Sequence, residues 1–200
     1  MSEIAREELC YDSLMTARAW LSLGALFIVA QAGILYLLGQ PTICECGIVK
    51  VWESAVLSVG NSQHLSDWYS FSHIIHGVIF YALLTYFFPR MPLFARFAFA
   101  VGIEVAWEIL ENTPMVIEHY RQQALAQGYV GDSILNSVSD TLMMVGGFFL
   151  AWRLPTWTSV ALCILLEVFV MYMIRDGLAL NILGFVYTPE FIASWQNSAQ

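Results

Sequence analysis

The chain has 200 residues, of which 58% are hydrophobic and only 12% are charged. A soluble domain of this length cannot bury so much apolar surface, so the composition indicates a membrane protein. The formal net charge is −8 and only eight residues are Lys or Arg, which excludes a nucleic-acid-binding protein because few cations are present to neutralise phosphates.

Five apolar stretches are long enough to cross a hydrocarbon core of about 30 Å as helices. They cover residues 20–39, 71–88, 93–110, 133–152 and 157–174. The first has a mixed-charge flank and no small-residue cleavage pattern, so we expect an uncleaved membrane span rather than a signal peptide. The sequence therefore predicts an all-α transmembrane bundle of about five spans.

We divide the chain into a cytoplasmic N-terminal segment over residues 1–18, a transmembrane bundle over 19–176 and a C-terminal tail over 177–200. The tail is apolar from 178 to 187 but too short to cross a membrane, and a second short apolar stretch follows Pro189. We expect a tail helix that lies at the membrane interface or re-enters the membrane.

Basic residues favour a cytoplasmic N-terminus, because five of the eight then lie on the cytoplasmic side and three outside. The inner set is Arg6, Arg18, Arg90, Arg96 and Arg153, and the outer set is Lys50, Arg121 and Arg175. The short Pro-containing turns at 89–92 and 153–155 then face the cytoplasm, and the longer connections at 40–70 and 112–132 face outward.

In this topology, polar residues gather at the outward ends of four helices. Members of each helical set are three or four residues apart, which is the spacing of one helical face. Ionised groups facing lipid are costly, so we expect these faces to turn into the bundle. The helical sets are His73 and His76; Glu104, Glu108 and Glu111; and Asp132, Asn136 and Asp140. Flanking polar residues are His64, Asp67, Asn112, Glu167, Arg175 and Asp176.

Acids outnumber bases in this layer, and buried carboxylates must pair, protonate or bind a cation. In the structural interpretation, Arg175 neutralises Glu167 or one of the three glutamates of residues 104–111, and hydrogen bonds satisfy the other polar groups. In the functional interpretation, the missing cation is a metal ion or a proton.

The metal interpretation assigns His73, His76, Glu104 and Asp132 to a divalent metal, which these ligand types allow to be zinc, iron or manganese. The proton interpretation gives the histidines a relay role between carboxylates that share a proton. The candidate catalytic residues are Glu108, Glu111, Asp140, His64 and Asp67, and the other polar site residues are Asn112, Asn136, Arg175 and Asp176. Cys44 and Cys46 can bind metal, form a disulfide or remain free thiols.

Four motifs resemble those of an uncharacterised bacterial family of multi-pass inner-membrane proteins. They are GNSQHLSDWY at 60–69, SHIIHG at 72–77, WEILENTP at 107–114 and GDSILNSVSDT at 131–141. The resemblance implies a bacterial inner-membrane location and brings no assigned activity.

A looser likeness is to the VanZ-like proteins, which place an acid and His before one span, a Glu late in the next, and an Asp and Asn at the start of another. Asp67 with His73 or His76, Glu104 or Glu108, and Asp132 with Asn136 or Asp140 follow that order, although the Gln that follows the Glu in that family is missing. This likeness implies a role in the cell envelope.

These observations lead us to expect a cell-envelope enzyme or binding protein with an outward-facing His/carboxylate site. Its expected partner is a membrane lipid or a lipid-linked substrate. The alternatives are a proton- or cation-coupled transporter and a non-catalytic membrane assembly subunit.

Overall fold

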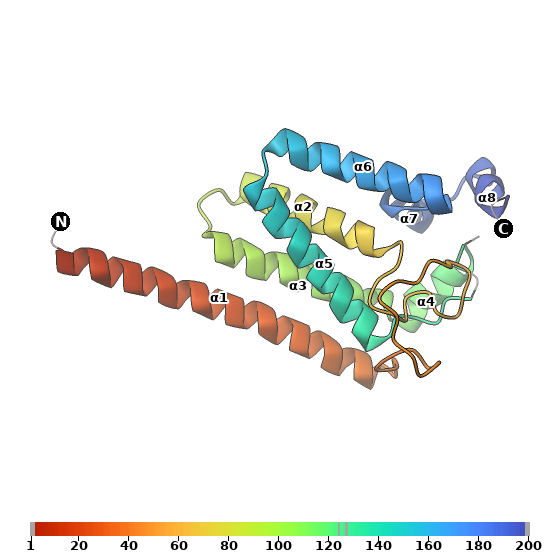
Figure 1. Ribbon diagram of the computed structural model, residues 1–200, viewed down its shortest axis with the longest axis horizontal. Coiled ribbons are helices and arrows are strands. Elements are labelled where there is room, and N and C mark those ends of the chain that lie inside the picture. Colours follow the sequence, from red (N-terminus) through yellow and green to blue (C-terminus); the bar gives the residue numbers. More distant parts are fainter. Residues whose placement is uncertain (1–2, 124, 127, 199–200) are drawn as a thin grey trace.

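The computed structural model describes residues 3–123, 125–126 and 128–198, with side chains described from residue 16 onward. Within these residues the chain forms eight helices and no strand, which confirms the all-α class. The long helices are α1 (Glu3–Leu37), α2 (Ser70–Phe87), α3 (Leu93–Glu111), α5 (Ile134–Arg153) and α6 (Thr156–Ile174) (Figure 1). The short helices are α4 (Pro114–Arg121), α7 (Leu178–Val186) and α8 (Glu190–Asn197).

Four helices are long and apolar enough to cross a membrane, and they identify the chain as a membrane protein by length and composition. They are residues Thr16–Leu37 of α1, together with α2, α5 and α6. The fifth expected span, α3, has 19 residues but carries Arg96 and three glutamates. The five-span count and the cytoplasmic N-terminus therefore stay predictions.

Two glycines allow α2 and α5 to pack against each other at close range. A Cβ atom on Gly77 would lie 2.0 Å from the Met144 carbonyl oxygen, and one on Gly147 would lie 2.0 Å from that of Ile74. Small residues at such crossings let two backbones approach closely in a membrane protein. This contact fixes the position of His73 on α2 relative to Asp140 on α5.

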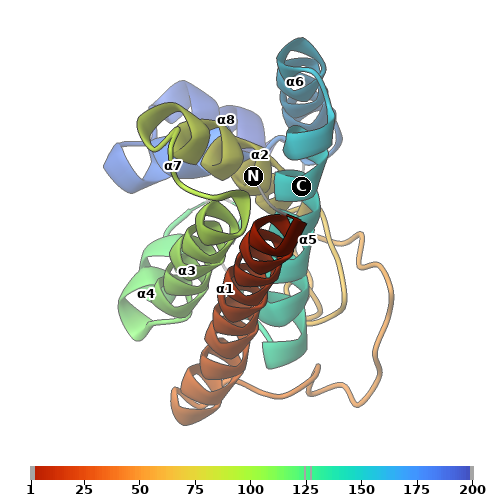
Figure 2. The ribbon, with the colours of Figure 1, turned by 90° about the vertical axis from the view of Figure 1, so that its left-hand side faces the viewer.

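The bundle has an apolar half and a polar half. A buried apolar cluster fills the space between α2, α3 and α5 on the side of the Pro-containing turns, and comprises Leu84, Phe97, Ala100, Val101, Val105, Met144 and Phe148. At the opposite end lie the long connections, α4, α7 and α8 (Figure 1). Figure 2 shows α6 at the edge of the bundle, where it packs against α2 and α5.

The connection between α1 and α2 closes the polar end. Its carbonyl groups at Pro41, Thr42 and Ser62 accept hydrogen bonds from the first backbone N–H groups around the start of α5. These N–H groups have no partner within their own helix, so the connection satisfies them. Cys44 and Cys46 lie in this connection and form a disulfide.

Candidate functional site

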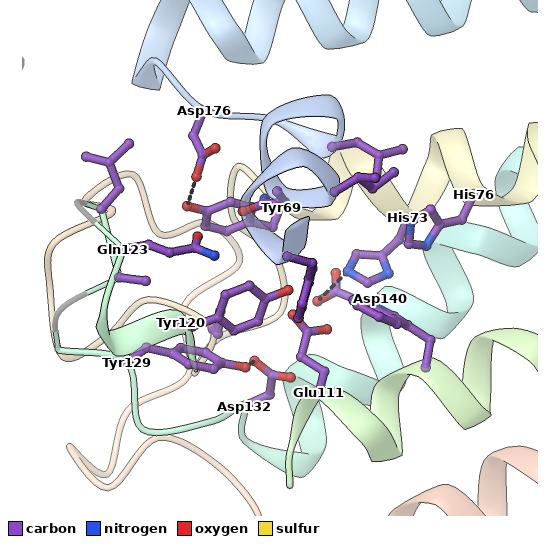
Figure 3. A pocket seen from close by; sticks show the side chains of 18 of the residues that line it. Tyr69, His73, His76, Glu111, Tyr120, Gln123, Tyr129, Asp132, Asp140 and Asp176 are labelled. Atoms are coloured by element: carbon purple, nitrogen blue, oxygen red, sulfur yellow. Dashed lines mark hydrogen bonds and ion pairs between the residues drawn. The ribbon is translucent and has the colours of Figure 1, made fainter. Parts of the chain in front are cut away.

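A cavity of about 370 Å³ lies at the polar end of the bundle (Figure 3). Side chains from α2, α3, α4, α5 and α7 line it, together with the end of the α1–α2 connection, the segment before α5 and residues of the tail. Its apolar lining includes Ile79, Phe80, Ile103, Trp107 and Phe185. Its ionisable lining comprises His73, His76, Glu111, Asp132, Asp140 and Asp176, with Tyr69, Tyr120 and Tyr129 beside them.

Glu104 joins the two histidines of α2. His73 Nδ1 lies 2.5 Å from one Glu104 carboxylate oxygen, and His76 Nδ1 lies 3.0 Å from the other. Glu104 is 0% exposed. Because it faces Nδ1 of both rings, the Nε2 atoms remain available for other partners. A carboxylate behind an imidazole is the usual arrangement for a metal-binding histidine, and it equally orients a histidine that acts as a base.

Asp140 of α5 completes this centre from the opposite side. Its Oδ2 lies 3.9 Å from His73 Nε2, and its Oδ1 accepts a hydrogen bond from Ser70 Oγ at 2.7 Å. The expected convergence of His73, Glu104 and Asp140 is therefore present in the structure. We call these residues, with His76, the His–carboxylate centre.

Glu108 lies beside this centre, buried between α2, α3 and α5. Its Oε2 accepts a hydrogen bond from Ser137 Oγ at 2.6 Å. Its Oε1 lies 3.2 Å from His73 Nδ1 but has no partner of hydrogen-bond geometry among the described residues. Beyond Ser137, the polar contacts continue to Gln31 of α1, which also accepts a hydrogen bond from Thr141.

Asp132 is held firmly at the entry to α5. Asn112 Nδ2 donates to Asp132 Oδ2 at 2.6 Å, Asp132 N donates back to Asn112 Oδ1 at 2.7 Å, and the Tyr129 hydroxyl donates to Asp132 Oδ1 at 2.8 Å. Burial raises the pKa of Asp132 to about 6. Glu111 lies near this group and faces the hydroxyl of Tyr120, whose pKa burial raises above its ordinary value.

Asp67 and Asp176 shape the polar end around the cavity. Asp67 accepts hydrogen bonds from the backbone N–H groups of Ser62 and Tyr69, and so fixes the turn before α2. Asp176 accepts one from the Tyr69 hydroxyl at 2.9 Å, which ties the tail to this turn. Burial raises the pKa of both carboxyl groups, that of Asp176 to about 6.

His64 and Asn136 lie apart from the cavity lining. His64 is 2% exposed, with Nδ1 accepting a hydrogen bond from the Lys50 backbone N–H and Nε2 lying 3.7 Å from Glu53 Oε2. Asn136 Nδ2 donates to the His64 carbonyl oxygen at 2.9 Å. These contacts join the α1–α2 connection to α5, and they give both residues a structural role in addition to any catalytic one.

The pairing of Arg175 with a carboxylate, which the structural interpretation uses, is absent from the described residues. Arg175 ends α6 in a left-handed conformation, with φ of 55°, and its guanidinium donates to the Trp195 carbonyl oxygen and Ser198 Oγ of the tail. Glu167 instead accepts hydrogen bonds from the first N–H groups of α7, at Leu178 and Ala179. The acids around the cavity therefore keep no arginine partner, as far as the described residues go.

Sequence reasoning missed the tyrosines and the row of polar side chains that runs from Glu108 through Ser137 to Gln31 of α1. Tyr69 and Tyr129 donate hydrogen bonds to cavity carboxylates, and Tyr120 faces Glu111. The available signal was that Tyr69 ends the motif at 60–69 and that Tyr129 lies two residues before the motif at 131–141. Gln31 is a single amide in an apolar stretch, and such a residue in a membrane span indicates a buried partner.

Two groups of side chains near the cavity could hold a metal ion. His73, His76 and Glu104 form one, and Glu108, Glu111 and Asp132 form the other. In each group, one ligand atom from every residue lies within 4.8 Å of the others. Asp132 thus belongs to a different group from the histidines with which the sequence analysis placed it.

The fold and this site define an all-α membrane protein with a His–carboxylate centre beside a cavity at one end of its bundle. Residues 35–198 match the family described as "Protein of unknown function (DUF2585)", and the chain belongs to that family. This confirms the resemblance to an uncharacterised family, whereas the likeness to VanZ-like proteins stays an expectation.

The chain is similar over most of its length to bacterial proteins named UPF0314 protein. It is 51% identical to the one from Sphingopyxis alaskensis over 177 residues, covering 88% of this chain and 94% of the relative. It is 48% identical to the one from Agrobacterium fabrum, with 90% of each chain covered, and 50% identical to the one from Rhizobium meliloti, with 92% and 94% covered. No solved structure matches.

Proposed function

We propose that this protein is an inner-membrane enzyme of the bacterial cell envelope that acts on a lipid or lipid-linked substrate. The observation that carries this proposal is the cavity, whose walls are apolar along the helices and whose end holds the His–carboxylate centre. Ligand sites commonly combine such apolar walls with a few convergent polar groups.

The position of the apolar walls favours entry from the side of the bundle. Ile79 on α2 and Ile103 on α3 line the cavity, yet they are 39% and 44% exposed. At 1.5 Å per residue, they lie roughly 12–14 Å along their helices from the polar ends. Residues that line a cavity and also face outward at this depth provide an opening toward lipid, which an acyl or isoprenoid chain can use.

The polar end supplies the chemistry of the proposed reaction. His73 and His76 present Nε2 while Glu104 holds their Nδ1 atoms, and Asp140 faces His73 Nε2. In the metal form of the proposal, the two imidazoles bind zinc or iron, which imidazole ligands suit better than manganese, and the nearby Asp140 serves as acid or base. In the metal-free form, the same imidazoles and Asp140 transfer protons to and from the substrate.

A proton- or cation-coupled transporter is the alternative that the buried polar row would favour. This row runs from Glu108 through Ser137 to Gln31 and Thr141. It then meets the apolar cluster that includes Val101, Met144 and Phe148. A relay must reach both faces of the membrane, so a row that ends at this cluster supports a one-sided site instead.

Lipid occupancy of the cavity tests the binding part of the proposal. Ile79→Trp adds an indole to the cavity lining, whereas Leu83→Trp adds one to the same exposed side of α2 outside the lining. In native mass spectrometry of protein extracted from its own membrane, we expect lipid adducts to fall at least severalfold in Ile79→Trp and to stay at the wild-type level in Leu83→Trp. Equal lipid adducts in the two variants would contradict a lipid in the cavity.

The catalytic part is tested in a strain that lacks the gene. The deletion strain should accumulate a lipid species that the wild-type gene removes on complementation. We expect His73→Asn and Asp140→Asn to leave that species in place while the proteins accumulate normally in the membrane. Full complementation by both variants would exclude the His–carboxylate centre from the reaction.

A further inference from the structure

The group formed by Glu108, Glu111 and Asp132 brings three carboxylates together, and the base in contact with it is His73, whose Nδ1 lies 3.2 Å from Glu108 Oε1. Two of the side chains come from the last turns of α3 and the third from the entry to α5. No Lys or Arg of the described part of the chain forms an ion pair with any of them: Lys50 pairs with Glu53, and Arg121 with Glu118. Three carboxylates this close cannot all ionise without a counter-charge.

Neutral donors hold the three side chains in place without supplying that counter-charge. Asn112 and Tyr129 donate to Asp132, Ser137 donates to Glu108, and the Tyr120 hydroxyl hydrogen-bonds to Glu111. Each carboxylate oxygen can accept more than one bond, so capacity for a further partner remains. The arrangement is therefore a prepared set of acceptors whose orientations are already fixed.

Glu108 Oε1 gives an independent indication that a partner is missing. The residue is 1% exposed, and this oxygen has no hydrogen bond among the described residues. Its nearest ion-pair contact, His73 Nδ1, is already 2.5 Å from Glu104 Oε1, and an imidazole nitrogen has one proton to donate. A buried carboxylate oxygen without a partner is rare, because the cost of its desolvation is then uncompensated.

We infer that Glu108, Glu111 and Asp132 bind a hard divalent cation of the Mn²⁺, Mg²⁺ or Ca²⁺ class, at a site separate from His73 and His76. All three ligand groups are oxygens, which these ions prefer over zinc-type nitrogen and sulfur ligands. Glu111 and Asp132 also line the cavity, so the cation has a route of entry and can keep a water ligand toward the cavity. The inference goes beyond the proposed function, since it requires no lipid.

Binding of Mn²⁺ alone, followed by electron paramagnetic resonance on the full chain in nanodiscs after chelator treatment, tests this site. The wild-type protein should bind one Mn²⁺ per chain with saturation. Glu111→Gln and Asp132→Asn should each weaken this binding at least tenfold. Two variants are used because Asp132 also holds the entry to α5, and size-exclusion chromatography shows whether each remains folded.

Two matched controls separate this site from its neighbours. Asp176→Asn removes a carboxylate from the same cavity outside the group, and His76→Asn removes a ligand of the histidine group. Both should keep wild-type Mn²⁺ affinity. Absence of saturable binding, or unchanged affinity in Glu111→Gln and Asp132→Asn, would overturn the inference, and so would loss of binding in His76→Asn. A failure of the lipid proposal would instead appear in the Ile79→Trp and deletion-strain experiments with Mn²⁺ binding intact.

Discussion

Glu104 has a different part in the site from the one that its position in the sequence suggests. Its spacing in the sequence led us to predict a metal ligand, but its two oxygens face Nδ1 of His73 and Nδ1 of His76. In that geometry the carboxylate fixes the orientation and tautomer of both rings, so that each can offer Nε2. Its contribution is then indirect, through the two imidazoles.

Replacement of Glu104 tests this indirect role. Glu104→Gln keeps the size of the side chain but removes the charge that both rings share. If the histidines bind zinc, we expect isothermal titration with Zn²⁺ to show an affinity about 10–100-fold lower than in the wild type, the usual effect of losing an orienting partner. Binding of Mn²⁺ should not change, because Glu104 lies outside the carboxylate group. Unaltered Zn²⁺ affinity would contradict the orienting role.

Residue-scale prediction from sequence succeeded where helical spacing alone decides proximity. His73, His76 and Glu104 meet because they lie on facing sides of α2 and α3. Arg175 does not form the carboxylate pair of the structural interpretation, because it ends α6 in a left-handed conformation and its side chain reaches the tail. Conformations of single residues at helix ends are not visible in hydropathy or spacing.

At the scale of helices, the contact between α2 and α5 positions the two sides of the His–carboxylate centre. Gly147→Ala places a Cβ atom against the backbone of Ile74, and backbone cannot give way as a flexible side chain can. Gly146→Ala is the matched control, since nothing lies within 4 Å of its Cβ position. We expect Gly147→Ala to destabilise the protein by about 1–3 kcal/mol, the usual cost of overpacking.

Thermal unfolding in one detergent measures this difference. The midpoint should fall for Gly147→Ala and stay near the wild-type value for Gly146→Ala. The close approach of α2 and α5 would be refuted by equal midpoints in the two variants.

Helices with long apolar stretches were predictable, and those in the connections were not. The expected stretches at 71–88 and 157–174 correspond closely to α2 and α6. In contrast, α4 lies inside the expected 112–132 connection, where its eight residues have low overall hydrophobicity. Such a short helix is stable mainly through tertiary contacts, here through the buried side chains of Val116, Ile117 and Tyr120.

At the scale of the whole molecule, the structure places all the candidate chemistry at one end. The starts of α2 and α5 lie at this end, together with the end of α3 (Figure 1). Since α2 and α5 are both candidate spans that begin at the same end of the bundle, we expect α3 to return the chain across the same thickness. The charges of α3 are compatible with this path, because its glutamates contact His73, His76 and Ser137 instead of lipid.

This connectivity leads to a topology prediction with five spans. With a cytoplasmic N-terminus, alkaline phosphatase fused after residue 58 or after residue 122 should be active, because both positions then lie outside. Fusions after residue 90 or after residue 154 should be inactive and should give activity with a cytoplasmic reporter instead. The fusion after residue 122 decides whether α3 is a membrane span, because this position lies outside only if α3 crosses the membrane. An inactive fusion after residue 122, together with an active fusion after residue 58, would show that α3 does not cross the membrane. Glu104 would then not lie on a membrane-spanning helix, which would contradict the lipid-facing cavity proposed above.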